Sequence, residues 1–114
     1  MKALLGLIMF LSLSTIMFGH AAESIEMSFD STGTILFINI THPVKTPNNH
    51  YISSIIVDVN GKERIKQTFP AQIDNAQQVA IYKLFDLKKD DKISVTTQCN
   101  IMGRKKETLI YSFE

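Results

Sequence analysis

The segment from Lys92 to Cys99 alternates polar residues with apolar or small ones over its whole length. A two-residue period places alternate side chains on opposite faces of a β-strand. The predicted core face carries Ile93, Val95, Thr97 and Cys99. Because a strand with one apolar face must bury that face, the segment predicts a packed sheet rather than a helix.

Similar short runs, rich in β-branched and aromatic residues, recur along the chain between turn-forming residues. They cover residues 25–29, 34–40, 51–59, 62–69, 79–85 and 109–113. The run at 34–40 is almost wholly apolar, which predicts a central strand covered on both faces. Asn60-Gly61 predicts a two-residue hairpin turn, because both residues tolerate positive φ angles. Seven short strands without a convincing helix predict an all-β fold, an immunoglobulin-like antiparallel β-sandwich.

The first 22 residues have the layout of a secretory signal peptide. Lys2 supplies the positive start, residues 3–18 are mostly apolar, and the small residues of 19–22 resemble a cleavage site. We expect cleavage after Ala21 or Ala22, which leaves one exported domain, residues 23–114, in the periplasm or the medium. A membrane anchor is the alternative, but the apolar run is short for a spanning helix. After cleavage we expect no membrane association.

The charges of the chain are nearly balanced, with 12 Lys and Arg against 11 Asp and Glu. Loss of Lys2 with the leader makes the mature domain neutral. Neutrality argues against a nucleic-acid partner. The one basic cluster, residues 104–106, is followed at once by Glu107, and we interpret it as a solvated turn.

The residues able to bind a transition metal lie at the ends of predicted strands, where a rigid sandwich presents functional side chains. His42 follows the strand at 34–40, His50 precedes the strand at 51–59, and Cys99 ends the strand at 92–99. Imidazole and thiolate ligands suit iron, copper or zinc, whereas calcium and magnesium prefer oxygen ligands. The alternative is two surface histidines and an inert, buried cysteine. As the only cysteine, Cys99 cannot form an intramolecular disulfide.

The order of these residues resembles that in superoxide reductases and the iron-binding domain of desulfoferrodoxin. The resemblance is carried by His42-Pro43, His50-Tyr51-Ile52, Asn60-Gly61, and Cys99-Asn100 followed by Gly103. In that family a ferrous ion on an immunoglobulin-like sandwich has four equatorial histidines and one axial cysteine, and superoxide is reduced to peroxide at the open position. The resemblance therefore implies iron held by His42, His50 and Cys99. Cys99 would be the axial thiolate and catalytic group, superoxide the substrate, and an unidentified protein or small molecule the electron donor.

The chain departs from the family pattern at several positions. Met102 stands where the family has a fourth histidine, and we retain it as a predicted metal ligand. Val44 replaces the methionine of the His-Pro-Met motif. The only upstream histidine, His20, lacks the family's Glu-Lys pair and is expected to leave with the leader.

Two other classes of function remain open from the sequence. The set His42, His50, Cys99 and Met102 has the donor types of a blue-copper centre, which predicts a copper-binding or electron-transfer protein without turnover. Cupredoxins, however, usually place a histidine between that cysteine and that methionine. The second class is a metal-free binding or carrier module with Cys99 as the carrier thiol. Self-association into a homo-oligomer is compatible with all of these functions.

Overall fold

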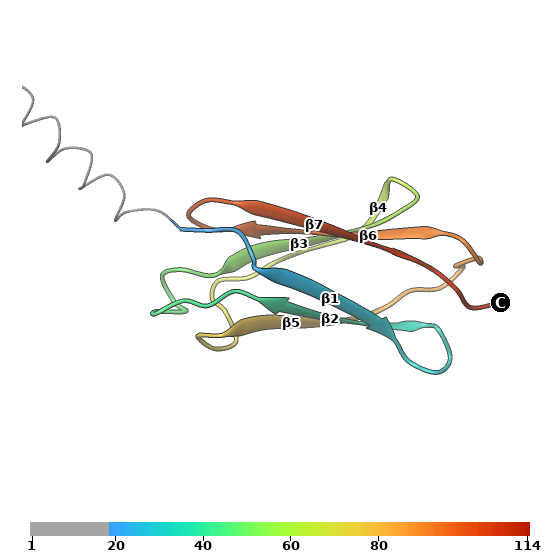
Figure 1. The fold of residues 1–114 in the computed structure, drawn as a ribbon, viewed down its shortest axis with the longest axis horizontal. Coiled ribbons are helices and arrows are strands. Elements are labelled where there is room, and N and C mark those ends of the chain that lie inside the picture. The colour runs from blue at the N-terminus through green and yellow to red at the C-terminus, as the bar shows by residue number, and fades with distance from the viewer. Residues whose placement is uncertain (1–18) are drawn as a thin grey trace, which may run out of the picture.

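Residues 19–114 are described by the structure, a computed structural model, so most of the expected leader lies outside the described residues. Seven strands form two antiparallel sheets, and residues 19–114 contain no helix (Figure 1). This part of the chain therefore offers no helix long and apolar enough to cross a membrane. The predicted seven-stranded sandwich is confirmed. The strands are β1 Ser24–Phe29, β2 Ile35–Thr41, β3 Ile52–Val59, β4 Lys62–Thr68, β5 Gln77–Lys83, β6 Lys92–Cys99 and β7 Arg104–Ile110.

The two sheets have the strand orders β1-β2-β5 and β4-β3-β6-β7. The chain crosses between the sheets after β2, after β4 and after β5, as in immunoglobulin-like sandwiches. Asn60 and Gly61 form the predicted β3–β4 hairpin turn, with φ angles of 52° and 84°. In the first sheet, Ser24 at the start of β1 pairs with Thr41 at the end of β2. The residues before β1 therefore lie beside the residues that follow β2.

The core lies between the sheets and consists mainly of isoleucine, valine and leucine. The predicted core face of β6 is confirmed, because each of its four residues is 2% exposed or less. Burial of an aliphatic side chain of this size contributes about 1.5–3 kcal/mol relative to its exposure. The fully buried aliphatic residues include Leu36, Ile38 and Ile40 of β2, Ile52, Ile55 and Val57 of β3, and Ile93 and Val95 of β6.

Two sequence-based expectations about the strands are wrong. The strand β2 is not covered on both faces, because Phe37 on the outer face of its sheet is 41% exposed. The last strand begins at Arg104 rather than at residue 109, because the turn before it is tight enough for Gln98 to pair with Arg104. The basic cluster at 104–106 therefore lies in β7, not in a turn. Its side chains alternate between the faces of a strand at the edge of the sheet.

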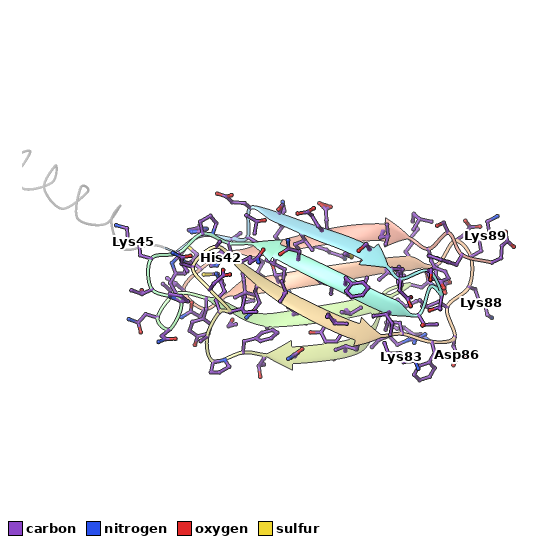
Figure 2. The ribbon with its side chains drawn as sticks, turned by 90° about the horizontal axis from the view of Figure 1, so that it is seen from below. His42, Lys45, Lys83, Asp86, Lys88 and Lys89 are labelled. Atoms are coloured by element: carbon purple, nitrogen blue, oxygen red, sulfur yellow. The ribbon has the colours of Figure 1, made fainter. Side chains whose placement is uncertain are left out.

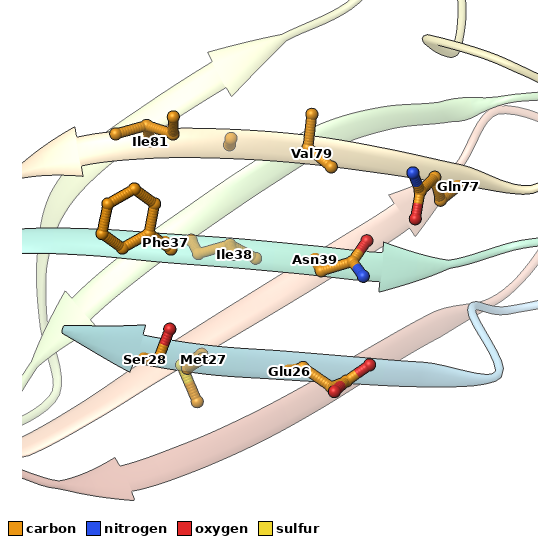
Figure 3. A pocket seen from close by; sticks show the side chains of 10 residues that line it. Glu26, Met27, Ser28, Phe37, Ile38, Asn39, Gln77, Val79 and Ile81 are labelled. Carbon is orange, nitrogen blue, oxygen red and sulfur yellow. The ribbon is translucent and has the colours of Figure 1, made fainter. Parts of the chain in front are cut away.

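The uncovered outer face of the β1-β2-β5 sheet carries a shallow pocket (Figure 3). Phe37 and Ile81 lie at one end of the lining and Gln77 lies at the other. Between them, Glu26, Asn39 and Val79 lie side by side across the three strands. None of the three histidines lines this pocket. The pocket is therefore separate from the strand ends at which the histidines lie.

A hydrogen bond between Tyr82 and Gln67 joins the two sheets, and the pKa of Tyr82 predicts how stability depends on pH. Tyr82 of β5 donates a hydrogen bond to Gln67 Oε1 of β4 at 2.5 Å, and burial raises the pKa of Tyr82 to about 12. A tyrosine in the unfolded chain loses its proton near pH 10. Since the unfolded state releases this proton first, the free energy of unfolding should fall as pH rises from 10 to 12. In urea titrations across that range, Tyr82→Phe should show a weaker fall than Tyr51→Phe, and equal slopes would contradict the assignment.

Candidate metal centre

Three imidazole side chains come together at one end of the sandwich. They belong to His20, His42 and His50, and their candidate ligand nitrogens all lie within 4.8 Å of one another. The ring centroids are 4.5 Å apart for His20 and His42, 5.0 Å for His20 and His50, and 4.9 Å for His42 and His50. Figure 2 shows His42 and the nearby Lys45 at the end of the molecule opposite Lys83, Lys88 and Lys89.

His42 directly follows β2 and is also fixed by Gln72, which lies in the connection between β4 and β5. Its ring is fully buried, and its Nδ1–H donates to Gln72 Oε1 at 2.8 Å. The Gln72 side-chain amide returns a hydrogen bond to the His42 carbonyl at 2.8 Å. With Nδ1 occupied in this way, Nε2 is the nitrogen available to a metal, which is the usual arrangement for a ligating histidine.

His50 is held in a short turn and tied to the β6–β7 connection. Its backbone N–H donates to the Thr46 carbonyl at 3.0 Å. On either side of His50, the Asn100 side chain accepts from Tyr51 N–H at 2.8 Å and donates to the Asn49 carbonyl at 3.0 Å. Asn100 therefore positions the residues that flank His50.

The backbone of β3 also bends near His50. The β3–β6 pairing changes register between Ile52 and Ser54, which leaves Ser53 as an extra residue. A bulge of this kind re-aims the chain at the end of a strand. It lies three residues after His50, where the chain enters β3.

His20 reaches the cluster from the extended segment that precedes β1. Its Nε2 lies 3.0 Å from the Pro43 carbonyl and its Nδ1 lies 2.9 Å from the Ala21 carbonyl. Its own carbonyl lies 2.8 Å from His42 Nε2. The antiparallel β1–β2 pairing explains this position, because it brings the residues before β1 beside His42 and Pro43.

The cluster contains one buried polar atom without a partner. His50 Nε2 is buried and finds no hydrogen-bond partner among residues 19–114. Burial of the ring, and to a lesser degree the charges of His42 and His20, lowers the pKa of His50. A lowered pKa keeps this imidazole neutral to lower pH, and the neutral ring is the form that binds a metal. A buried nitrogen without a partner is costly, so a bound cation would satisfy it.

The donor types suit a first-row transition metal, but ring nitrogens of both His42 and His20 already contact carbonyl oxygens, and an ion would have to replace such a contact at each ring. Imidazole nitrogens bind such metals at about 2.1 Å, so two on one ion lie at most about 4.2 Å apart. The observed cluster, with a limit of 4.8 Å, is slightly wider. His42 Nε2 now faces the His20 carbonyl, and a metal would have to displace that oxygen. The two arrangements therefore compete for the same nitrogen.

The two predicted sulfur ligands occupy different positions. Cys99 is 2% exposed at the end of β6, opposite Ile52, and its Sγ lies 4.0 Å from Asn100 Oδ1. Its sulfur is not part of the group formed by the three imidazoles. Met102 is 51% exposed in the β6–β7 turn. The structure brings the predicted His42 and His50 together, while ligation by Cys99 and Met102 stays a prediction.

Sequence reasoning missed two residues of this site. It assigned His20 to the leader, whereas the observed antiparallel pairing of β1 with β2 places the residues before β1 beside His42. It gave no role to Gln72, which lies between two predicted strands. A single polar residue in such a segment carries no periodic signal, so only the folded chain identifies it as the partner of His42.

Comparisons with known proteins identify one solved structure with a similar fold. No family model matches the chain, and no curated protein matches it. Among solved structures, the superoxide reductase (1Fe-SOR) from Giardia intestinalis is similar, with a TM-score of 0.61 and 20% sequence identity. The match covers 82% of this chain and 98% of that chain. The chain therefore has a superoxide-reductase-like fold, in agreement with the predicted class.

Gln72→Met should weaken both folding and metal binding. The substitution leaves His42 Nδ1, the His42 carbonyl and Ile52 N–H without their buried partner, which we expect to cost about 3 kcal/mol of the free energy of unfolding. Loss of a partner behind a ligand should lower the affinity for zinc about 10- to 100-fold. Gln78→Met is the matched control, because Gln78 is equally buried but contacts Ala71 and Val79 instead. Calorimetric zinc titration should show unchanged affinity for that control, and an equal loss in both variants would refute the role of Gln72.

Proposed function

We propose that this protein is an exported, mononuclear non-haem metal protein whose ion is held by His20, His42 and His50. The observation that carries the proposal is the convergence of three imidazoles around the buried, unpartnered His50 Nε2. His42 and His50 come from the two ends of the β2–β3 connection, and His20 comes from the segment before β1. Gln72 orients the ring of His42 through its other nitrogen. Metal-ligating histidines usually have such a supporting contact at the other ring nitrogen.

Iron is the metal that we propose, and superoxide is the proposed substrate. The proposal draws on the superoxide-reductase-like fold and on the sequence resemblance around His42, His50 and Cys99. Fold alone does not define function, so the donor set has to carry the chemistry. Imidazole ligands are compatible with iron, and a thiolate from Cys99 would complete the donor types of the resembling family.

A ferrous ion at this site would supply one electron to superoxide, which with two protons gives hydrogen peroxide. An external donor must then return the electron. The chain itself contributes orientation and access. Gln72 fixes the ring of His42, Asn100 fixes the residues around His50, and Lys45 is the one cationic side chain of the exposed loop between the two histidines. A cation near an open site attracts an anionic substrate.

Anaerobic addition of ferrous iron to the purified protein should give one bound ion per chain. Single substitutions His20→Ala, His42→Ala and His50→Ala should each lower iron affinity at least about tenfold, because each removes a proposed ligand. Lys45→Ala is the control from the same loop and should bind iron normally. Cys99→Ser tests the sulfur ligand separately, through loss of thiolate-to-iron absorption. Iron binding that is unchanged in all three histidine variants would rule the site out.

The iron-loaded protein should convert superoxide to hydrogen peroxide without forming dioxygen. A reductase yields one peroxide per superoxide consumed, whereas a dismutase yields one peroxide and one dioxygen for every two. Pulse radiolysis with peroxide and oxygen detection distinguishes these ratios. Copper is tested in the same preparation by competitive titration, and a preference for copper without reaction with superoxide would favour the electron-transfer alternative.

A further inference from the structure

The residues that end the expected leader, Gly19 to Ala22, are integrated into the folded domain. Ala22 is 6% exposed and belongs to the core cluster. The next residue, Glu23, donates its N–H to the Thr41 carbonyl at 2.8 Å and so extends the β1–β2 pairing. Contacts of this kind are typical of a structural segment rather than of a tail.

Two glycines allow this segment to lie directly on the metal site. A Cβ on Gly103 would lie 2.4 Å from the Ala21 backbone nitrogen, too close for any side chain there. A Cβ on Gly19 would lie 2.7 Å from Ile101 Cβ and 3.1 Å from His50 Nε2. The segment therefore packs against the β6–β7 turn and covers the unpartnered nitrogen of His50.

Cleavage at the position expected from the sequence would dismantle this arrangement. A cut after Ala21 or Ala22 removes His20 and with it one of the three imidazoles. It also removes the carbonyl that faces His42 Nε2 and the backbone that packs on Gly103. The remaining domain would hold two histidines, with His50 Nε2 uncovered.

We propose that the mature protein keeps His20, that any cleavage of the leader falls before this residue, and that the processing point thereby decides whether the metal site has its third imidazole. The ligand role of His20 rests on the proposed function. The retention of residues 20–22 rests on packing alone, which is independent of any metal.

The first test identifies the N-terminus of the exported protein. The full chain with its own leader is produced in a bacterial host, and the exported fraction is analysed by intact mass and N-terminal sequencing. A first residue at His20 or upstream of it supports the proposal, and a chain that begins at Ala22 or Glu23 overturns it. This result does not depend on metal binding. If His20 is retained but no variant binds zinc or iron, the proposed function fails while the retention stands.

The second test asks whether the docked segment supports the site. Gly103→Ala places a methyl group against Ala21, whereas Gly61→Ala introduces a side chain at a similar positive φ, 84° against 108°, with nothing within 4 Å. Both variants should lose stability through backbone strain. Only Gly103→Ala should lower zinc affinity, by about tenfold or more, because it displaces the segment that carries His20. Equal zinc affinity in the two folded variants would overturn the proposed coupling.

Discussion

The end of the sandwich that carries the histidines depends on one buried side-chain amide. Gln72 is 6% exposed, and its two polar atoms make four hydrogen bonds, to the His42 ring, the His42 carbonyl, Ile52 N–H and the Asp74 carbonyl. Its own backbone N–H donates to the Pro47 carbonyl at 3.1 Å. The His42 ring nitrogen, the His42 carbonyl and Ile52 N–H would otherwise be buried without this partner, at a cost of about 1–3 kcal/mol each. One residue thus joins the end of β2, the start of β3 and the loop between them.

These hydrogen bonds of Gln72 also distinguish the histidine end of the sandwich from the opposite end, which consists of exposed turns. At the far end, Asn60 and Asp91 bond mainly to each other and to exposed turn backbone. At the histidine end, three crossing segments meet: the approach to β1, the connection from β2 to β3, and the β6–β7 turn. Each delivers a side chain or a backbone group that the others need. Ligands from distant parts of the sequence are therefore fixed by the same contacts that close the sandwich.

The fold was predictable because its cause is local. Alternation in 92–99 and the Asn60-Gly61 turn each follow from the chemistry of neighbouring residues, and the structure agrees with both. The strand β7 was misplaced because Arg104, Lys105 and Lys106 look like a turn by charge, whereas an edge strand tolerates such residues on both faces. The prediction that both faces of β2 are covered was wrong because the hydrophobicity of a side chain does not determine whether another element packs on it. Only the folded chain shows that Phe37 on this face is exposed.

The site was half predictable, for a physical reason. His42 and His50 flank predicted strands, so their proximity follows from a β-sandwich with a short connection between sheets. His20 was excluded by a local pattern, since small residues after an apolar run are typical of a cleavage site. Small residues also permit close backbone packing, and Gly19 and Ala21 serve that purpose against Ile101 and Gly103. A cleavage site and a closely packed segment both need small side chains, so only the tertiary contacts distinguish the two interpretations.

The contact between the His20 carbonyl and His42 Nε2 is favourable only when a proton or a cation lies between the two atoms. Gln72 Oε1 and the His20 carbonyl can only accept hydrogen bonds, so a His42 ring with a single N–H donates to one of them and faces the other with its lone pair. Two electron-rich atoms 2.8 Å apart repel each other unless a proton or a metal ion neutralises one of them. Together with the unpartnered His50 Nε2, this arrangement leaves two nitrogens that a single cation would satisfy. The cluster is therefore a place where binding of an ion relieves costs that the folded chain already carries.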